Sequence, residues 1–416
     1  MNGLDFRWVD QADIAATEYP QDVVAFERRE WGNFYGWVKD LYEEDRLLVS
    51  EGQDEMAELR AVMERTNRLQ EQIDHLERGE IGTLNHRIEE ARLNLRSLEL
   101  QGRSGSLESE KVKEYVNELE SAYELVNQQL MILYEQMNRY RVTLVDVSGR
   151  EKTLPVATLI RAWVPNSMSV PEKLIMYVKN FWTVISAEPR EANTEGGIFP
   201  AIFGTVMMVL IMSVAVVPFG VLAAVYLKEY ARQGMLTQMI RIAVNNLAGV
   251  PSIVFGVFGL GFFVYAVGGT IDQLFYSEAL PNPTYGTGGI LWASLTLALM
   301  TVPVVIVATE EGLSAVPREY RECSLGLGAT KLESLLRVVI PCAMPGILTG
   351  LILAVARATG EVAPLMLTGV VKLAPSLPVD SFFPFVHLDR KFMHLGFHIY
   401  DVGFQSPNVE AAKPMV

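Results

Sequence analysis

Four long apolar stretches in the second half of this 416-residue sequence constrain its fold more than any other feature. They cover residues 198–227, 242–271, 279–309 and 338–371, and only the last contains charged residues, Arg357 and Glu361. About 20 apolar residues are enough for a helix to cross a bilayer. All four stretches contain glycine and proline, which membrane helices tolerate when neighbouring helices satisfy the freed backbone groups. We therefore expect a membrane domain with four helical spans.

The negative charge of the chain is concentrated in its first half. Residues 1–198 hold 23 Lys and Arg against 36 Asp and Glu, whereas residues 199–416 hold 12 against 13. The first half is therefore expected to face water, and its acidity argues against a nucleic acid partner because phosphates would be repelled. The two cysteines, Cys323 and Cys342, lie in the second half, so no disulfide framework supports the first.

Basic residues in the short loops predict the orientation of the spans. The loops after the first and third spans carry Lys228, Arg232 and Arg241, and Arg318, Arg321, Lys331 and Arg337, respectively. Basic loops are retained in the cytoplasm. Residues 1–198 and the tail after residue 371 should then lie outside, in the periplasm. No segment before residue 198 could export such a domain, so either a preceding membrane helix is absent from this sequence or the orientation is reversed.

The acidic half contains a segment with strong helical periodicity. Its apolar residues alternate steps of four and three, a spacing that keeps one stripe against a partner helix; they are Val112, Val116, Leu119, Tyr123, Val126, Leu130, Leu133 and Met137. Residues 56–98 show a looser version, and the glycines and serines of residues 101–106 separate the two. We expect an antiparallel coiled-coil hairpin over about residues 53–140. Parallel dimerisation through the same stripe is the alternative.

Short β-rich segments flank the hairpin. Residues 141–147 and 156–160 are rich in β-branched residues, and Ser148 and Gly149 form a turn between them. Residues 4–9 are a third candidate strand. We therefore expect residues 1–198 to form a soluble α+β domain and residues 199–416 to form an all-α membrane domain.

The basic loop at residues 310–341 has an organised pattern. Its second part predicts a helix, a glycine-rich turn and a second helix that ends in Pro341 at the membrane entry. Leu332, Leu335, Leu336 and Val339 are expected on one side of the second helix. Such a unit would present a rigid projection to the cytoplasm. A docking site for a cytoplasmic partner is the functional interpretation, and an ordinary loop helix is the alternative.

This loop resembles the EAA loop of bacterial ABC importer permeases. Glu322 and Gly328 keep the spacing of that motif, while Cys323 and Ser324 stand in place of its two alanines. Further segments, residues 197–205, 225–230, 246–252, 356–364 and 389–395, resemble the PstA-type permeases of phosphate importers, and the resemblance covers residues 197–416. It implies the type I importer permease fold and a loop that couples to an ATPase. The coupling residues would be Glu322, Gly326, Gly328, Ala329, Arg337 and Pro341.

The resemblance also implies an assembly in the bacterial inner membrane. Its members have six membrane helices, a second homologous permease subunit, a dimer of cytoplasmic ABC ATPases and a periplasmic phosphate-binding protein. By that pattern the first and last helices are missing from this sequence. The chain contains no Gly-x-x-x-x-Gly-Lys-Ser/Thr phosphate cradle, so a partner must hydrolyse ATP. No catalytic site or cofactor is expected, and the spacing of His387, His394 and His398 fits no zinc pattern.

Arg357 and Glu361 are the charged residues at membrane depth. Residues four apart share a face of a helix and can form an ion pair. Charges inside a membrane are costly and usually line a polar path, and an Arg fork suits a phosphate oxyanion better than a Lys does. We predict that Arg357 lines the translocation pathway and that Glu361 holds or releases it. A purely structural ion pair is the alternative.

Two other functions remain open. A permease for another oxyanion, such as sulfate or molybdate, would share the same features. A membrane-anchored sensor or scaffold would use the coiled coil to bind a partner. An anchor requires neither the charge pair nor the cytoplasmic projection, so the transport function is favoured.

Overall fold

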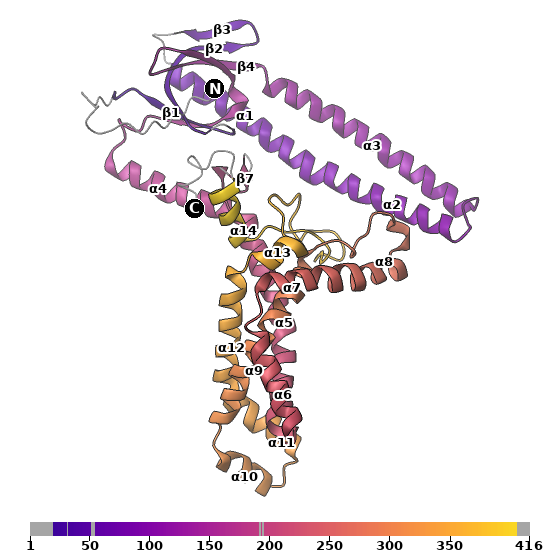
Figure 1. Cartoon of the computed structure of the whole chain (residues 1–416). Helices are drawn as coiled ribbons and strands as arrows, with labels where there is room; N and C mark the ends of the chain where they lie inside the picture. The colour runs from indigo at the N-terminus through magenta and orange to yellow at the C-terminus, as the bar shows by residue number, and fades with distance from the viewer. Residues whose placement is uncertain (1–19, 31, 51–54, 191–192, 194, 406–416) are drawn as a thin grey trace. The chain divides into compact units, whose positions relative to one another are not determined.

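The computed structural model describes residues 20–30, 32–50, 55–190, 193 and 195–405. The predicted strand at residues 4–9 lies outside these. The chain divides into two compact units (Figure 1), residues 1–185 with 195–197 and residues 186–194 with 198–416. We call them the N-terminal unit and the C-terminal unit.

A six-stranded antiparallel sheet forms the base of the N-terminal unit. Its strand order is β5-β4-β2-β1-β6, with β3 paired to the far end of β2. The strands are β1 (Val24–Arg28), β2 (Phe34–Glu43), β3 (Arg46–Ser50), β4 (Tyr140–Asp146), β5 (Glu151–Pro155) and β6 (Leu159–Trp163). The sheet curls around the first turns of helix α1 (Glu55–His75). Leu59, Val62 and Met63 of α1 are buried there with Phe26, Leu41 and Leu144 of the sheet.

A helical hairpin is inserted between β3 and β4. Helix α1 continues through the π-helical turn η2 (Leu76–Ile81) into α2 (Gly82–Leu100), and α3 (Leu107–Met137) packs against all three. Ser106 caps α3 by accepting a hydrogen bond from the Ser109 N–H at 3.2 Å. Every residue of the predicted stripe in α3 is buried or half-buried. The stripe therefore packs within the chain, while coiled-coil packing stays a prediction.

The sheet differs from the prediction at both ends of the hairpin. Strand β4 lies where residues 141–147 predicted it, but residues 156–158 form a 3₁₀ turn, η3, and β6 starts only at Leu159. Strands β1 to β3 were not predicted at all. In β2 the inward pattern Phe34, Gly36, Val38 shifts by one residue and resumes at Leu41, because the register with β4 changes between Val38 and Asp40. The bulge interrupts the two-residue period on which strand prediction depends.

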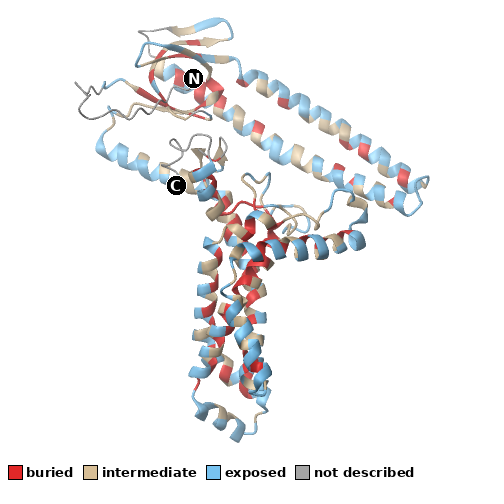
Figure 2. Ribbon diagram, viewed as in Figure 1, coloured by how far each residue is buried: buried red, intermediate tan, exposed pale blue. Residues whose placement is uncertain are grey.

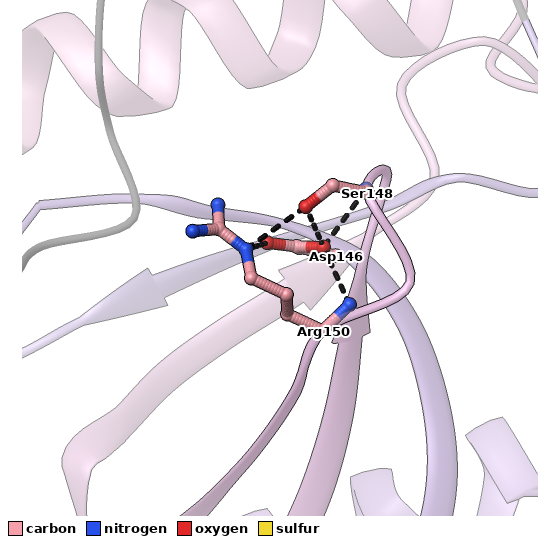
Figure 3. A network of polar contacts seen from close by, with 3 residues as sticks. All are labelled: Asp146, Ser148 and Arg150. Atoms are coloured by element: carbon pink, nitrogen blue, oxygen red, sulfur yellow. Dashed lines mark hydrogen bonds and ion pairs between the residues drawn. The ribbon is translucent and has the colours of Figure 1, made fainter.

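The β4–β5 turn is closed by one carboxylate (Figure 3). Asp146 accepts hydrogen bonds from the Ser148 hydroxyl at 2.6 Å, the Ser148 N–H at 2.8 Å, and the N–H and Nε of Arg150 at 2.9 Å each. Donors to the ionised form favour it. The bond from the Ser148 hydroxyl and those from Arg150 therefore lower the pKa of Asp146 from 3.8 to about 2.

Asp146→Ala is expected to loosen this turn in a pH-dependent way. Because the pKa is lower in the folded state, the carboxylate stabilises the turn fully above about pH 4 and loses this effect as the pH falls towards 2. Hydrogen exchange of residues 140–155, corrected for intrinsic pH dependence, should be several-fold faster in the variant at pH 6 and equal to wild type near pH 2. Glu114→Ala, on the exposed face of α3, is the control. A difference that does not depend on pH would contradict this account of the turn.

The C-terminal unit is helical, and its described residues include four helices long and apolar enough to span a membrane. These are residues Phe199–Tyr230, Ser252–Phe275, Ile290–Ala315 and Lys331–Gly360. They comprise α5 (Phe199–Val225) with η5 (Tyr226–Tyr230); α7 (Ser252–Phe258), η6 (Gly259–Gly268) and α8 (Gly269–Phe275); α9 (Ile290–Ala315); and α11 (Lys331–Ser334), η8 (Leu335–Val339) and α12 (Ile340–Gly360). Shorter segments are α6 (Met235–Leu247), η7 (Ser277–Ala279), α10 (Arg318–Gly326), α13 (Ala363–Thr368), α14 (Leu395–Tyr400) and η9 (Asp401–Gln405).

Helix α9 lies at the centre of this unit. In its most apolar window 67% of the residues are buried, against 22–28% in the other three candidate spans, and Figure 2 shows buried residues gathered where α5, α9 and α12 meet. Glycines allow the close approach: Cβ atoms added at Gly220 and Gly346 would lie 2.6 Å from Val305 Cγ1 and Gly312 Cα, respectively. Small residues at helix contacts are typical of membrane bundles.

The span boundaries differ from those predicted by hydropathy. Residues 242–247 belong to α6, because Gly249, Val250 and Pro251 separate it from the second span. Residues 280–289 form a loop that contains Pro281, Pro283 and three glycines, so the third span starts at Ile290. The fourth begins seven residues earlier than predicted, at Lys331, and ends at Gly360. Apolar composition alone does not distinguish a span from an apolar loop beside it.

Candidate functional site

The turn between α10 and α11 is built around Gly328. The Gly328 N–H donates to the Leu325 carbonyl at 3.0 Å and the Ala329 N–H donates to the Ser324 carbonyl at 3.2 Å. This pair of bonds is the Schellman motif, which requires a residue in the left-handed region after the helix. Gly328 has a φ of 89°, so the glycine predicted for the turn occupies the position that needs it.

The helix after the turn has a defined start. Thr330 accepts a hydrogen bond from the Glu333 N–H at 3.3 Å, and Glu333 Oε2 accepts one from the Thr330 N–H at 2.9 Å. This reciprocal pair is a capping box. The helix then continues without interruption to Gly360. Pro341 lies inside this helix, at the second residue of α12 after the π-helical turn η8. Proline has no N–H to donate to the carbonyl four residues earlier, and the π-helical turn lies where that bond is missing.

The projecting end of this unit is concave and partly apolar. A hollow of about 520 Å³ is lined by residues of α10, the turn, α11 and η8. They are Tyr320, Cys323, Ser324, Leu327, Gly328, Ala329, Glu333, Arg337 and Val338. Leu327 at the tip is 91% exposed, and Tyr320 and Leu325 are also exposed. A hollow with exposed apolar anchors at its rim has the chemistry of a protein contact.

One ion pair and two further contacts join α10 and α11 to η5, which follows α5. Arg321 Nη2 lies 3.2 Å from Glu229 Oε1 and donates to the Leu313 carbonyl at 2.6 Å. Lys331 donates to the Glu229 carbonyl and lies 4.6 Å from the Tyr230 ring centroid. These contacts connect α10 and α11 to η5 and to α9. Sequence reasoning missed this connection, although Glu229 is the acidic residue of an otherwise basic loop.

The predicted coupling residues are only partly brought together. Gly328, Ala329 and Arg337 line the hollow, whereas Glu322 and Gly326 are exposed on α10 and Pro341 lies further along the helix. The four apolar residues predicted for one side of the second helix differ in burial. Leu335 and Val339 are buried, but Leu332 and Leu336 are 55% and 56% exposed. The buried stripe continues four residues at a time to Ala343 and Ile347, which pack on Leu313 and Val316.

Arg357 and Glu361 lie at the other end of the same helix. Arg357 Nε is 3.6 Å from Glu361 Oε1, with side chains 31% and 23% exposed. Arg357 lies in the last turn of α12 and Glu361 is the C-cap residue, so the pair has the predicted spacing of four residues at the end of the helix. A separation of 3.6 Å is too long for a hydrogen bond. Among the described residues Arg357 has no other polar partner, and its guanidinium donors remain available for an oxyanion.

The histidines of the C-terminal segment serve separate local structures. His387 Nε2 lies 2.9 Å from Asp380 Oδ1, and His394 Nδ1 accepts the Phe397 N–H at 3.3 Å to cap α14. Burial lowers the pKa of His394 to about 4 and also lowers that of His398. Within the part of the chain that the structure describes, no three His, Cys, Asp or Glu residues are grouped to hold a metal ion.

Comparison with known proteins identifies the class. Residues 216–376 match the family described as "Binding-protein-dependent transport system inner membrane component". The "Phosphate transport system permease protein PstA 1" of Mycobacterium tuberculosis is 36% identical over 202 residues, which cover 49% of this chain and 60% of that protein. The "Probable ABC transporter permease protein YqgI" of Bacillus subtilis is 32% identical over 234 residues, covering 55% and 74%, respectively. The PstA protein of Yersinia pestis is 34% identical over 190 residues, covering 45% and 57%.

The class is thus an inner membrane component of a binding-protein-dependent transport system, a non-catalytic transport subunit. The chain belongs to the ABC transporter permease family and, within it, is similar to the PstA phosphate permeases. It spans about 60% of the length of the first mycobacterial relatives that it matches.

Proposed function

We propose that this chain is a permease subunit of an ATP-driven phosphate importer. The continuous helix from Lys331 to Gly360 carries the proposal, because it joins the projecting loop at one end to Arg357 at the other. At 1.5 Å per residue, Lys331 and Arg357 are about 39 Å apart along the helix axis. A force applied at the loop therefore reaches the guanidinium through a rigid element.

The proposed site residues have distinct roles. Glu322, Gly326, Gly328, Ala329, Arg337 and Pro341 belong to the loop that couples to a cytoplasmic ATPase dimer. Arg357 contacts the translocated oxyanion, and Glu361 holds Arg357 while the pathway is closed. Half-buried charges on membrane helices usually line such pathways.

The proposed assembly follows from the names of the relatives and from the basic loops. Phosphate is the substrate named in the PstA relatives. A second homologous permease would complete the pathway, and a periplasmic phosphate-binding protein would deliver the ion. The loops that contain Lys228 and Arg318 face the cytoplasm, so the N-terminal unit lies in the periplasm. No cofactor is required, because the partner ATPase supplies the energy.

Uptake of radiolabelled phosphate tests the substrate. In cells that express this chain and its companion subunits and lack other phosphate importers, unlabelled phosphate should compete fully. The same excess of sulfate or molybdate should leave uptake within about twofold of the control, as expected of a site selective for one oxyanion. Strong competition by sulfate or molybdate would instead favour a permease for that anion. Unchanged phosphate uptake after deletion of the chain would favour the scaffold function.

A further inference from the structure

Helix α4 (Val170–Ser186), which ends the N-terminal unit, has two chemically different halves. At about 100° per residue its apolar side chains cover about half of the circumference. They include Leu174, Val178 and Phe181, while Glu172, Lys173 and Lys179 lie on the other half. Such segregation is typical of a helix that lies between water and an apolar phase.

The apolar half of α4 is largely exposed among the residues that the structure describes. No residue of this 17-residue helix is buried. Seven large apolar side chains are 60–80% exposed, namely Val170, Leu174, Ile175, Tyr177, Val178, Phe181 and Trp182. Single exposed apolar residues are normal, but a continuous apolar face on one helix marks a contact with a partner or a membrane.

The polar half of α4 is turned towards its own domain. Asn180 Oδ1 accepts a hydrogen bond at 3.0 Å from Arg161 Nη1, which belongs to β6 of the sheet. Met176, on the same half as Asn180, is half-buried. The sheet therefore lies on the polar side of α4, and the apolar side faces away from it.

The residue that follows α4 is hydrogen-bonded to the start of a candidate membrane span. Ala187, the residue after α4, accepts a hydrogen bond at 3.2 Å from the N–H of Phe199, the first residue of α5. Phe199, Val206 and Leu210 of α5 are exposed apolar residues, as expected of a lipid-facing surface. Because α4 ends at Ser186, directly before Ala187 in the chain, the bilayer is the large apolar phase nearest to the end of α4.

We propose that α4 lies in the membrane surface, with its apolar face in the lipid interface beside the start of α5. Phe181 and Tyr177 enter the boundary between headgroups and acyl chains, where aromatic side chains are favoured. Lys173 and Lys179 extend from the polar half towards anionic headgroups. The N-terminal unit is then attached to the membrane along about 26 Å of helix and not through one flexible connection.

Spin labels on the full chain test this proposal. With Cys323 and Cys342 changed to Ser, single cysteines are placed at Val178 on the apolar half and at Lys179 on the polar half. Leu125→Cys on α3 is the matched control, because Leu125 and Val178 are 62% and 60% exposed. The labelled chain is reconstituted in vesicles of phosphatidylethanolamine and phosphatidylglycerol, and collisions with oxygen and with a water-soluble nickel chelate are compared.

The measured quantity is the ratio of the collision rate with oxygen to that with the nickel chelate. This ratio should be about threefold or more higher for the Val178 label than for the Leu125 and Lys179 labels, because oxygen concentrates in lipid. Equal ratios at Val178 and Leu125 would place the face in water and overturn the proposal. A Val178 label shielded from both reagents would also overturn it, since a second copy or another protein would then cover the face. Circular dichroism of each variant verifies that the helices are intact.

Discussion

Replacing Gly328 by Val is expected to reduce phosphate uptake about tenfold, since a left-handed backbone costs a non-glycine residue about 1–2 kcal/mol and a β-branched one more. A Cβ at this position meets no atom within 4 Å, so the penalty comes from the φ of 89° and not from a collision. The strained turn shifts α10 relative to α11 and misplaces the hollow. Uptake and ATP hydrolysis, measured on the same membranes, should become uncoupled while the subunit remains in the membrane.

Gly326→Val is the comparison variant, which separates a requirement of the turn conformation from a requirement of the loop surface. Gly326 lies two residues earlier in the same unit, has no atoms near an added Cβ and does not have a positive φ. Valine has a higher helix propensity than glycine, so this substitution adds no backbone strain at position 326. Normal coupled uptake in Gly328→Val would refute the coupling role, and equal losses in both variants would indicate a contact with the exposed surface and not a requirement of the turn.

The turn could be predicted from sequence because its determinants are local. Gly328 and the Thr330 to Glu333 pair define how one helix stops and the next begins, whatever surrounds them. The exposed positions of Leu332 and Leu336 could not be predicted in this way. Leu313 and Val316 select the stripe through Leu335 and Val339, and only the tertiary structure places those partners.

For the membrane helices too, some features can be predicted from the sequence and others cannot. Their existence follows from length and apolarity, which are properties of the chain alone. Their ends depend on Pro251, Pro281 and Pro283, which terminate helices inside apolar sequence. In the N-terminal unit, the bulge between Val38 and Asp40 interrupts the alternating pattern of β2, so this ten-residue strand could not be predicted from the sequence. The apolar stripe of α3 is regular, and that helix could be predicted. Regular periods can be predicted, and the irregularities that fit elements to each other cannot.

Individual residues of the candidate site could be predicted from the sequence, but the contacts that link them could not. Arg357 and Gly328 are identifiable as a membrane charge and a turn glycine. The bond network from Arg321 and Lys331 to Glu229 joins residues about 100 positions apart, and no local pattern indicates it. Gly328 lies just before the helical segment Lys331–Gly360 and Arg357 lies near its other end, and this connection is visible only in the structure.

Arg357→Lys should lower phosphate uptake about tenfold or more, although it conserves the positive charge, because an ammonium cannot replace a bidentate fork on an oxyanion. The measured quantity is the initial rate of radiolabelled phosphate uptake at equal amounts of membrane-inserted subunit. Arg232→Lys, an exposed loop arginine, is the matched control and should transport normally.

The same variant separates the pathway role from a structural ion pair. Lysine can still form an ion pair with Glu361, so a structural pair predicts near-normal uptake in Arg357→Lys. Glu361→Gln removes the carboxylate but leaves the guanidinium, so it should retain more uptake than Arg357→Lys if the oxyanion binds Arg357. The pathway assignment fails if Arg357→Lys transports like wild type, or if Glu361→Gln is the more damaging change, because either outcome means that the guanidinium acts on Glu361 and not on the transported ion.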